Sequence, residues 1–405
     1  MHPLSQAPTR RHWLQLTTVS AVSLPFWPAA QAETAWAAIE KRARGQTVYF
    51  NAWAGSPAIN AYIQWASAQA KERYGVQVEH VKISDAADTV RRVRNEKAAG
   101  KTRGSVDLVW INGENFLAMK REQLLFGPFA EQLPHFALVD TQGKPTTRLD
   151  FAEPTEGFEA PWGMAQLTFM VDAQRTPEPP RSLAALLAFA KAHPGRVSYP
   201  RPPNFHGTTF VKQVLMDVNR DRSALYRPVT DTAFSQATAP LWTALDALHP
   251  LLWRGGRQFP LSAEAQRQMF ADGELLLALT FNPNDAANEI AAGRFAKSVT
   301  SYQFDSGTIG NTHFLAIPFN AAAADAAQVF ANFLLSPMAQ ARKADIAAWG
   351  DPTVLSMQKL TPADRALFGQ QRAPGQVERS APTIPEPHGS WVEPLEREWA
   401  RRYGG

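Results

Sequence analysis

The chain has 405 residues, of which 45% are apolar and 19% are charged, with 12 Trp and no Cys. This composition is typical of a globular protein with a full hydrophobic core, and it excludes disulfide scaffolds, thiolate zinc sites and cysteine nucleophiles. The formal charge is +4, but two of the 41 basic residues lie in residues 1–32, which carry no acid. The remaining 39 basic residues face 37 acidic ones, and this balance argues against a nucleic-acid partner.

The first 32 residues have the pattern of an export signal. A pair of arginines precedes a modestly apolar run, Leu14 to Trp27, and Ala30-Gln31-Ala32 matches the small-x-small site of signal peptidases. We therefore predict a signal peptide over residues 1–32, cleavage near Ala32 and a periplasmic mature protein.

Two export routes fit this segment. The sequence Thr9-Arg10-Arg11-His12-Trp13-Leu14 resembles a twin-arginine signal, but ordinary secretory signals often carry two arginines as well. Further along, no stretch reaches the roughly 18 consecutive apolar residues of a membrane-spanning helix. The densest apolar run, Leu275 to Phe281, has the length of a strand. We expect no stable insertion of the mature protein into a membrane.

Strands and helices alternate in the first part of the mature chain. Buried strands are predicted over Thr47–Ala52, Val76–Ile83 and Val106–Ile111. Helices are predicted from Pro57, with Ser56 as its N-cap, and over Asp85–Ala99. This order is typical of a parallel sheet covered by helices on both faces.

From about Asp150 the chain becomes rich in Pro and Gly, and a second α/β unit follows. Its predicted strands are Leu167–Val171, Val197–Tyr199 and Leu275–Thr280. Its predicted helices are Leu183–Ala192, Thr208 to about Val218, Leu241–Leu252 and Ala263–Ala271. The chain as a whole is therefore predicted to be an α/β protein of two units.

The C-terminal part returns to one strand and two helices before a proline-rich end. The strand is predicted over Thr312–Ile317, and the helices over Ala321–Leu335 and Met338–Ala348. Residues 373–394 contain five prolines and are predicted to wrap over the surface in an extended form. We expect Trp391, Leu395 and Trp399 to anchor this end of the chain.

Aromatic and amide side chains follow several of the predicted strands. In open α/β sheets, ligands bind beyond the carboxyl ends of the strands, and helix starts add free N–H groups there. Each residue alone is better explained as a core or turn residue, but their joint placement favours a binding site. The candidate ligand-binding residues are Trp53, Ser56, Asn112, Glu114, Asn115, Trp162, Phe205, Thr208, Thr209, Asn282, Asn284 and Asp285.

Four segments carry a resemblance to a known family. The run Leu167–Asp172 leads through Pro179-Pro180 into a Leu-rich helix, Pro194-Gly195-Arg196-Val197 forms a turn, and residues 331–340 (ANFLLSPMAQ) form a late helix pair. With these segments the chain resembles solute-binding proteins of ABC importers, in the two-lobed type II class that includes thiamine-, polyamine- and iron-binding members. The likeness covers roughly residues 45–350 and is greatest to a subgroup of unassigned substrate.

This resemblance implies an α/β fold of two lobes, each a central sheet flanked by helices, with the ligand cleft at the hinge. Residues 33–158 and 305–405 would form the first lobe and residues 159–304 the second, with crossings near Trp162 and near residues 301–307. The implied partners are a small-molecule solute and a permease with its ATPase. We expect a monomer with no cofactor, no metal and no nucleic-acid partner.

The candidate residues also suggest the chemistry of the solute. Rings offer flat faces for stacking or for holding a cation, and carboxylates offer negative charge. The rings are Trp53, Trp162, Phe205 and Phe281. The acids are Glu114, Asp285 and Glu289. Together they favour a cationic or aromatic solute such as thiamine or a polyamine, whereas ferric iron is disfavoured because no two of the seven tyrosines are adjacent.

An exported α/β hydrolytic enzyme is the competing hypothesis. The sequence contains no nucleophile elbow, no dinucleotide-binding glycine turn and no paired metal-ligating histidines. Gly100-Lys101-Thr102 imitates the end of a phosphate-binding loop, but Asn95 stands where its first glycine belongs. Asp285 and Glu289 lie at a predicted helix start, where acids are favoured by the helix dipole alone. We therefore expect no enzymatic activity.

Overall fold

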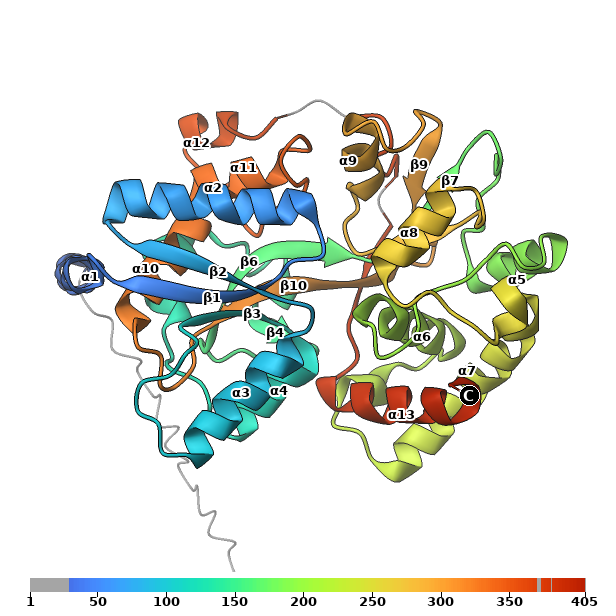
Figure 1. Ribbon diagram of the computed structural model, residues 1–405, viewed down its shortest axis with the longest axis horizontal. Helices are drawn as coiled ribbons and strands as arrows, with labels where there is room; N and C mark the ends of the chain where they lie inside the picture. The colour runs from blue at the N-terminus through green and yellow to red at the C-terminus, as the bar shows by residue number, and fades with distance from the viewer. Residues whose placement is uncertain (1–28, 370–372, 380, 405) are drawn as a thin grey trace, which may run out of the picture.

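The computed structural model describes residues 29–369, 373–379 and 381–404, which form two lobes joined by long strands (Figure 1). Residues 1–28 of the predicted signal peptide lie outside the described residues, and its last four residues begin helix α1 (Ala29–Ala43). No helix in the described part of the chain is long and apolar enough to cross a membrane.

The first lobe is built on a mixed sheet in the order β11-β10-β3-β1-β2. Its strands β1 (Thr47–Trp53), β2 (Gln77–Ile83) and β3 (Leu108–Ile111) run parallel, as predicted, whereas β10 (Thr308–Ala316) is antiparallel to β3. The sheet is mixed because β10 comes from the far end of the chain and enters from the other lobe.

Both faces of this sheet are covered by helices, because side chains alternate across each strand. On one face, β1 packs against α2 (Pro57–Tyr74) and α10 (Ala324–Leu334). On the other face, β3 packs against α3 (Ala86–Ala98) and α4 (Gly113–Arg121). Figure 1 shows α2 above the sheet and α3 and α4 below it.

The second lobe has a smaller antiparallel sheet in the order β8-β7-β9. Its strands are β7 (Thr168–Asp172), β8 (Ala278–Thr280) and β9 (Val299–Tyr302). Its helices are α5 (Leu183–Ala192), α6 (Phe205–Val218), α7 (Asp231–Leu248), α8 (Ala263–Ala271) and α9 (Asp285–Ala291). Phe169 of β7 stacks on Phe304 at 4.8 Å within the larger core of this lobe, and Met170 faces a separate cluster on the other side of the sheet.

Two antiparallel strands, β6 (Glu159–Gln166) and β10, carry the chain between the lobes. Trp162 and Leu315 belong to the core of the first lobe, whereas Ala165 and Ile309 belong to the core of the second. The Pro/Gly segment around Trp162, which the sequence suggested to be irregular, is thus a strand. The pairing shifts register between His313 and Phe314, so the ladder is interrupted between the two cores.

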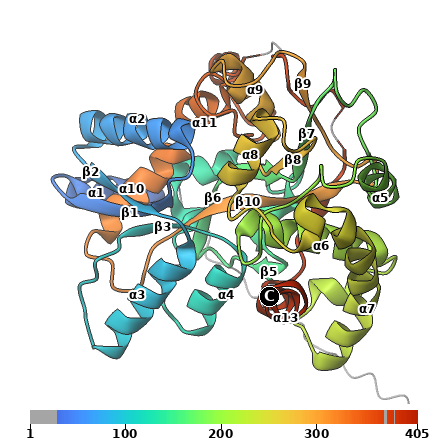
Figure 2. The same ribbon diagram turned by 45° about the vertical axis from the view of Figure 1, so that its right-hand side comes forward.

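The C-terminal part differs from the expected assignment of residues 305–405 to the first lobe. Helices α11 (Pro337–Ala344) and α12 (Pro362–Ala366) follow α10. Strand β11 (Thr383–Pro385), however, pairs with the end of β10 where Ile309 and Ile384 are buried in the second core, and α13 (Val392–Tyr403) packs on α6. The reason is apolar burial, because the three expected anchors, Trp391, Leu395 and Trp399, are buried in the core of the second lobe. Figure 2 shows α13 against the second lobe, below α6 and beside α7.

Several predicted element boundaries also differ. Val197 and Tyr199 are buried in the second core but form no strand. Helix α6 starts at Phe205 and not at Thr208, because the side chain of Asn204 caps it by accepting from the backbone N–H of His206 at 3.1 Å. Ser56 precedes α2 as predicted but makes no side-chain capping hydrogen bond.

Candidate functional site

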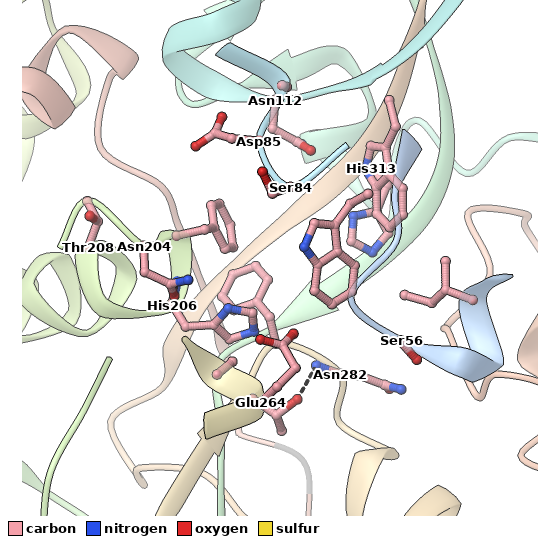
Figure 3. Close-up of a pocket in the computed structure, with 18 of the residues that line it drawn as sticks. Ser56, Ser84, Asp85, Asn112, Asn204, His206, Thr208, Glu264, Asn282 and His313 are labelled. Carbon is pink, nitrogen blue, oxygen red and sulfur yellow. Dashed lines mark hydrogen bonds between the residues drawn. The ribbon is translucent and has the colours of Figure 1, made fainter. Parts of the chain in front are cut away.

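A cavity of about 280 Å³ lies between the two lobes (Figure 3). Residues at the carboxyl ends of β1, β2 and β3 line it from the first lobe, residues at the starts of α6, α8 and α9 line it from the second, and β10 borders it between them. Ligands bind at this edge of the strands in open α/β sheets. The volume is close to the lower end for ligand pockets and therefore suits a small solute.

The structure brings most of the sequence-predicted candidates to this one cavity. Strand ends and helix starts that are far apart in the sequence meet here, and Figure 3 shows Ser56, Asn112, Thr208 and Asn282 around the same space. The candidates that line the cavity are Trp53, Ser56, Asn112, Glu114, Asn115, Phe205, Thr208, Asn282 and Asp285.

Three candidates lie outside the lining. Trp162 is fully buried behind the cavity, with its ring 5.0 Å from that of Trp110, because β6 turns this side chain into the first core. Thr209 is also fully buried, since it is next to Thr208 on α6 and points in another direction. Asn284 donates from its side-chain amide to the carbonyl of Gly350 and so has a structural partner.

Aromatic rings line the cavity from both lobes. Trp53 and Trp110 come from the first lobe, and Phe205 meets Phe281 edge to face at 5.2 Å in the second. Phe205 is 40% exposed, an unusual fraction for a large apolar side chain. Such rings can stack on a planar group or hold a cation over their faces.

One group of charges beside the cavity is fully paired, and we call it the paired corner: His313, Lys343 and Asp351. Lys343 Nζ lies 2.5 Å from one carboxylate oxygen of Asp351, and His313 Nε2 lies 3.1 Å from the other. Burial would raise the pKa of Asp351, but Lys343 and His313 hold that pKa below its ordinary value. The charges of this corner therefore satisfy one another.

Acids that line the second-lobe side are also paired in part. Arg267 contacts Asp285 at 3.2 Å, and Arg294 binds Glu289 through two hydrogen bonds of 2.5 and 2.7 Å. Burial raises the pKa of Asp285, with Arg267 opposing that shift. These acids lie at the start of α9, where the helix dipole was predicted to stabilise them. They also have arginine partners that the sequence pattern did not suggest.

Other carboxylates in the lining have no Lys, Arg or His within 4.0 Å among the residues that the structure describes. They are Asp85, Glu114, Glu264 and Glu396. We call Asp85, Glu114 and Glu396 the acidic corner, because the charge of Asp85 raises the pKa of both glutamates and the charge of Glu396 raises that of Glu114. Asp85 caps α3, Glu114 accepts from Asn115 at 3.0 Å, and Glu396 accepts from the hydroxyl of Thr208 at 2.7 Å.

The two glutamates of the acidic corner titrate near neutral pH. Burial raises the pKa of Glu114 to about 7, against the opposing charge of Lys212, and Glu396 and Asp85 raise it further. Burial also raises the pKa of Glu396 to about 7, although the hydrogen bond from Thr208 and the charge of Lys212 oppose the shift. Carboxylates with such values are poorly compensated, and a bound cation would favour their ionised form.

A buried lysine faces this corner but is already engaged. Lys212 of α6 forms a 2.8 Å ion pair with Glu386, and both side chains are at most 2% exposed. Its ammonium also lies 4.2 Å from the ring centre of Phe151. Beside it, Asn311 donates to Glu386 at 3.2 Å, whereas its side-chain oxygen is buried without a hydrogen-bond partner in the described chain.

Sequence reasoning missed several residues of the lining. Asp85 follows a predicted strand and could have been included by the same strand-end argument that selected Asn112. Trp110 lies within a strand, and Lys212 lies in the middle of a helix, where nothing in the local pattern marks them. Glu396 lies more than 280 positions from Glu114, so only the packing of α13 brings it to the cavity.

Comparisons with known proteins agree with this architecture. The chain matches the model of the bacterial extracellular solute-binding protein family over residues 64–364. Protein YnjB of Escherichia coli (strain K12) is 50% identical over 370 residues, which cover 91% of this chain and 94% of YnjB.

Solved structures show the same fold at low sequence identity. The periplasmic binding protein AfuA from Actinobacillus pleuropneumoniae, with fructose-6-phosphate bound, is 15% identical with a TM-score of 0.61, covering 89% of this chain and 99% of AfuA. The spermidine/putrescine ABC transporter substrate-binding protein PotD from Streptococcus pneumoniae (strain Canada MDR_19A) is 12% identical with a TM-score of 0.60, covering 88% of this chain and 98% of PotD. The predicted two-lobed α/β fold is confirmed.

Proposed function

The chain belongs to the bacterial extracellular solute-binding protein family, and we propose that it captures a small organic cation in the cleft between its lobes. Its general role is that of a solute-binding protein of an ABC transporter, as the family and the structural relatives indicate. The cationic nature of the solute is our inference from the lining of this chain's own cleft.

The observation that carries this proposal is the excess of carboxylates in the cavity. Arg267 and Arg294 are paired with Asp285 and Glu289, and Lys212 is paired with Glu386, so among the described lining residues no Lys or Arg is left to receive an anion. Asp85, Glu114, Glu264 and Glu396 are left without such partners. The names of the structural relatives cover both fructose-6-phosphate and spermidine or putrescine, so they do not distinguish a phosphate from an amine. The charges of this cleft favour the amine.

Closure of the lobes would couple binding to transport. The carboxylates come from both lobes, and a cation between them gains its full set of contacts only when the cleft is closed. We propose that the closed form then engages a membrane permease, which an ATPase drives, and that the protein acts as a monomer. Export by residues 1–32, through the general secretory or the twin-arginine route, would place it in the periplasm.

A ligand screen by thermal unfolding tests the proposal. The purified protein is mixed with thiamine, 1,4-diaminobutane, spermidine, amino acids, sugars, sulfate and phosphate. A solute at 100 times its dissociation constant stabilises a protein by about 2.7 kcal/mol, so a true ligand gives a clear rise in the unfolding temperature. We expect such a rise with one or more organic cations. Stabilisation by sugars or oxyanions without any effect of cations would contradict the proposal.

Two matched tryptophan variants locate the effect in the cleft. Trp53→Leu removes a ring that lines the cavity, whereas Trp253→Leu removes a ring outside the lining whose indole N–H donates to Glu274 at 2.6 Å. We expect Trp53→Leu to reduce the ligand-induced rise and Trp253→Leu to leave it unchanged. Equal effects of the two substitutions would place the bound solute elsewhere.

A further inference from the structure

The C-terminal helix α13 brings a carboxylate to the cleft opposite the first lobe. Glu396 of α13 and Glu114 of α4 line the same cavity, and neither has a basic partner within 4.0 Å in the described ranges. Glu396 is held by the hydroxyl of Thr208, which Figure 3 shows at the border of the cavity. The two carboxylates thus approach the cleft from elements that belong to different lobes.

Contacts with both lobes hold α13 in place. Trp391 and Trp399 anchor it in the second core, where their indole N–H groups donate to the carbonyl of Arg227 at 3.0 Å and to the hydroxyl of Tyr199 at 2.8 Å. Just before the helix, the backbone N–H of Gly389 donates to the carbonyl of Phe151 in the first lobe at 3.1 Å.

Glycine at position 389 permits a close approach to α4. A Cβ there would lie 3.1 Å from the backbone nitrogen of Glu114, so the turn before α13 rests directly on the start of α4. A larger residue would push the two elements apart. This contact holds the turn before α13 against the start of α4, and Glu396 and Glu114 line the same cavity from these two helices.

A second observation in the same cavity points independently to a ligand. Asn311 of β10 is 4% exposed and lines the cavity, and its side-chain oxygen accepts no hydrogen bond from any described residue. A buried acceptor without a donor is unfavourable by about 1 to 3 kcal/mol, and a partner that donates to it removes this cost. A solute carrying N–H donors would satisfy it.

We infer that Glu114, Glu396 and the side-chain oxygen of Asn311 form a subsite for a primary ammonium group of the solute. This inference rests on the proposed function, since it names the part of the cleft that would bind the cation. A primary ammonium carries three N–H donors and one positive charge, and this place offers three acceptors and an excess of negative charge. A quaternary ammonium carries the charge but no donor, so it would leave Asn311 unsatisfied.

Binding at this subsite would release protons near neutral pH. Several charged groups face the two glutamates: Asp85 from the N-cap of α3, Asp150 from β4 (Leu149–Asp150), Lys212 from α6 and Glu393 from α13 itself. Since burial raises the pKa of both glutamates to about 7, each is about half protonated at pH 7 in the empty cleft. An incoming ammonium favours the ionised forms, and binding should strengthen between pH 6 and pH 8.

Titration calorimetry with 1,4-diaminobutane and its fully N-methylated bis-quaternary analogue tests the subsite. At pH 8 we expect the primary diamine to bind at least tenfold more tightly than the quaternary analogue. Glu114→Gln and Glu396→Gln should each weaken diamine binding by about 10- to 100-fold, the range for a lost charge-assisted hydrogen bond. Glu393→Gln, on the same helix but with a side chain that is 85% exposed, is the matched control and should change binding less than twofold.

Thr208→Val is a second, milder variant that removes the hydroxyl donor of Glu396 while keeping the shape of the side chain. It should weaken diamine binding by a few-fold. Because the lost hydrogen bond no longer lowers the pKa of Glu396, the empty cleft holds more protons at pH 7, and proton release on binding should increase, measured as the difference in apparent enthalpy between phosphate and Tris buffers. Far-ultraviolet circular dichroism and unfolding of each empty variant establish that the fold is kept.

The possible outcomes distinguish failure of the subsite from failure of the proposed function. Tight diamine binding that is unchanged in Glu114→Gln and Glu396→Gln would overturn the subsite and leave a cation-binding protein. Preference for the quaternary analogue would do the same. Binding of only anions or sugars in the wider screen would overturn both the subsite and the proposed cationic solute.

Discussion

The paired corner and the acidic corner border the same cavity, and both place charges in poorly solvated surroundings. In the paired corner, Lys343 and His313 contact both oxygens of Asp351, so the charges compensate one another within the fold. In the acidic corner, Glu114 and Glu396 have only hydrogen bonds from neutral groups. This comparison indicates that a buried charge with its own partner stabilises the fold, whereas a buried charge without a partner marks a place where a ligand can supply the opposite charge.

Breaking the ion pair of the paired corner should give the largest change in the free energy of unfolding. Lys343→Met removes the ammonium and leaves the buried carboxylate of Asp351 with His313 as its remaining ionic partner. Removal of one partner of a buried ion pair costs about 3 to 5 kcal/mol, because the remaining charge is uncompensated. Urea unfolding at pH 7 measures this loss. Lys343→Met combined with Asp351→Leu should recover most of it, and a loss below about 1 kcal/mol in the single variant would show that the pair is not needed.

Replacing the two glutamates of the acidic corner should change the free energy of unfolding by a smaller amount and in the opposite direction. The pKa values of Glu114 and Glu396 in the folded protein lie above the ordinary glutamate value, so the folded state binds more protons than the unfolded state between about pH 4.5 and 7. The stability gained from these protons is present at low pH and is lost as the pH rises through 7. Glu114→Gln combined with Glu396→Gln should therefore stabilise the empty protein at pH 8 by roughly 1 kcal/mol.

The measurement is the free energy of unfolding of the empty protein at pH 6 and pH 8. Wild type should lose stability over this interval, and the double glutamine variant should lose less. A wild-type stability that rises over the interval would contradict the unpaired state of these two glutamates, and Glu393→Gln should follow the wild-type curve.

An exposed pair completes the comparison and should give the smallest effect. Arg397 and Glu393 of α13 are 3.1 Å apart, but their side chains are 69% and 85% exposed. Water and salt screen such a pair, so Arg397→Gln should change the free energy of unfolding by less than about 0.5 kcal/mol and leave solute binding unchanged. A large loss here would mean that ion pairing as such, and not burial, governs the stability of this protein.

Local patterns predicted much of the fold. The spacing of apolar residues and the positions of Gly and Pro predicted β1, α5 and α8 within one residue of their observed ends, because these elements bury faces that are already visible in a short window of sequence. Val197 to Tyr199 has a strand-like composition but forms no strand. Its side chains are buried in the core, yet no neighbouring strand is placed to pair with its backbone.

The candidate site was predictable only where it follows strand ends. Asn112 and Asn282 were found because a strand leads directly to each of them. Trp162 was expected in the cleft but lies in the first core. A tryptophan in a Pro/Gly-rich segment has the same sequence pattern whether its ring faces the cleft or the core. Glu396 gave no signal at all, because an acid on an amphipathic C-terminal helix is normally a solvated residue.

The α/β class, the family resemblance and the strand ends at which a ligand would bind could be inferred from the sequence, because they depend on short-range periodicity and on contiguous motifs. Three features follow only from the packing of distant segments: β10 joins the two lobes, α13 packs on the second lobe, and Glu396 and Glu114 line one cavity. These outcomes depend on which apolar faces bury one another over hundreds of residues, and burial also decides whether a carboxylate is a solvated surface group or an unpaired charge awaiting a cation.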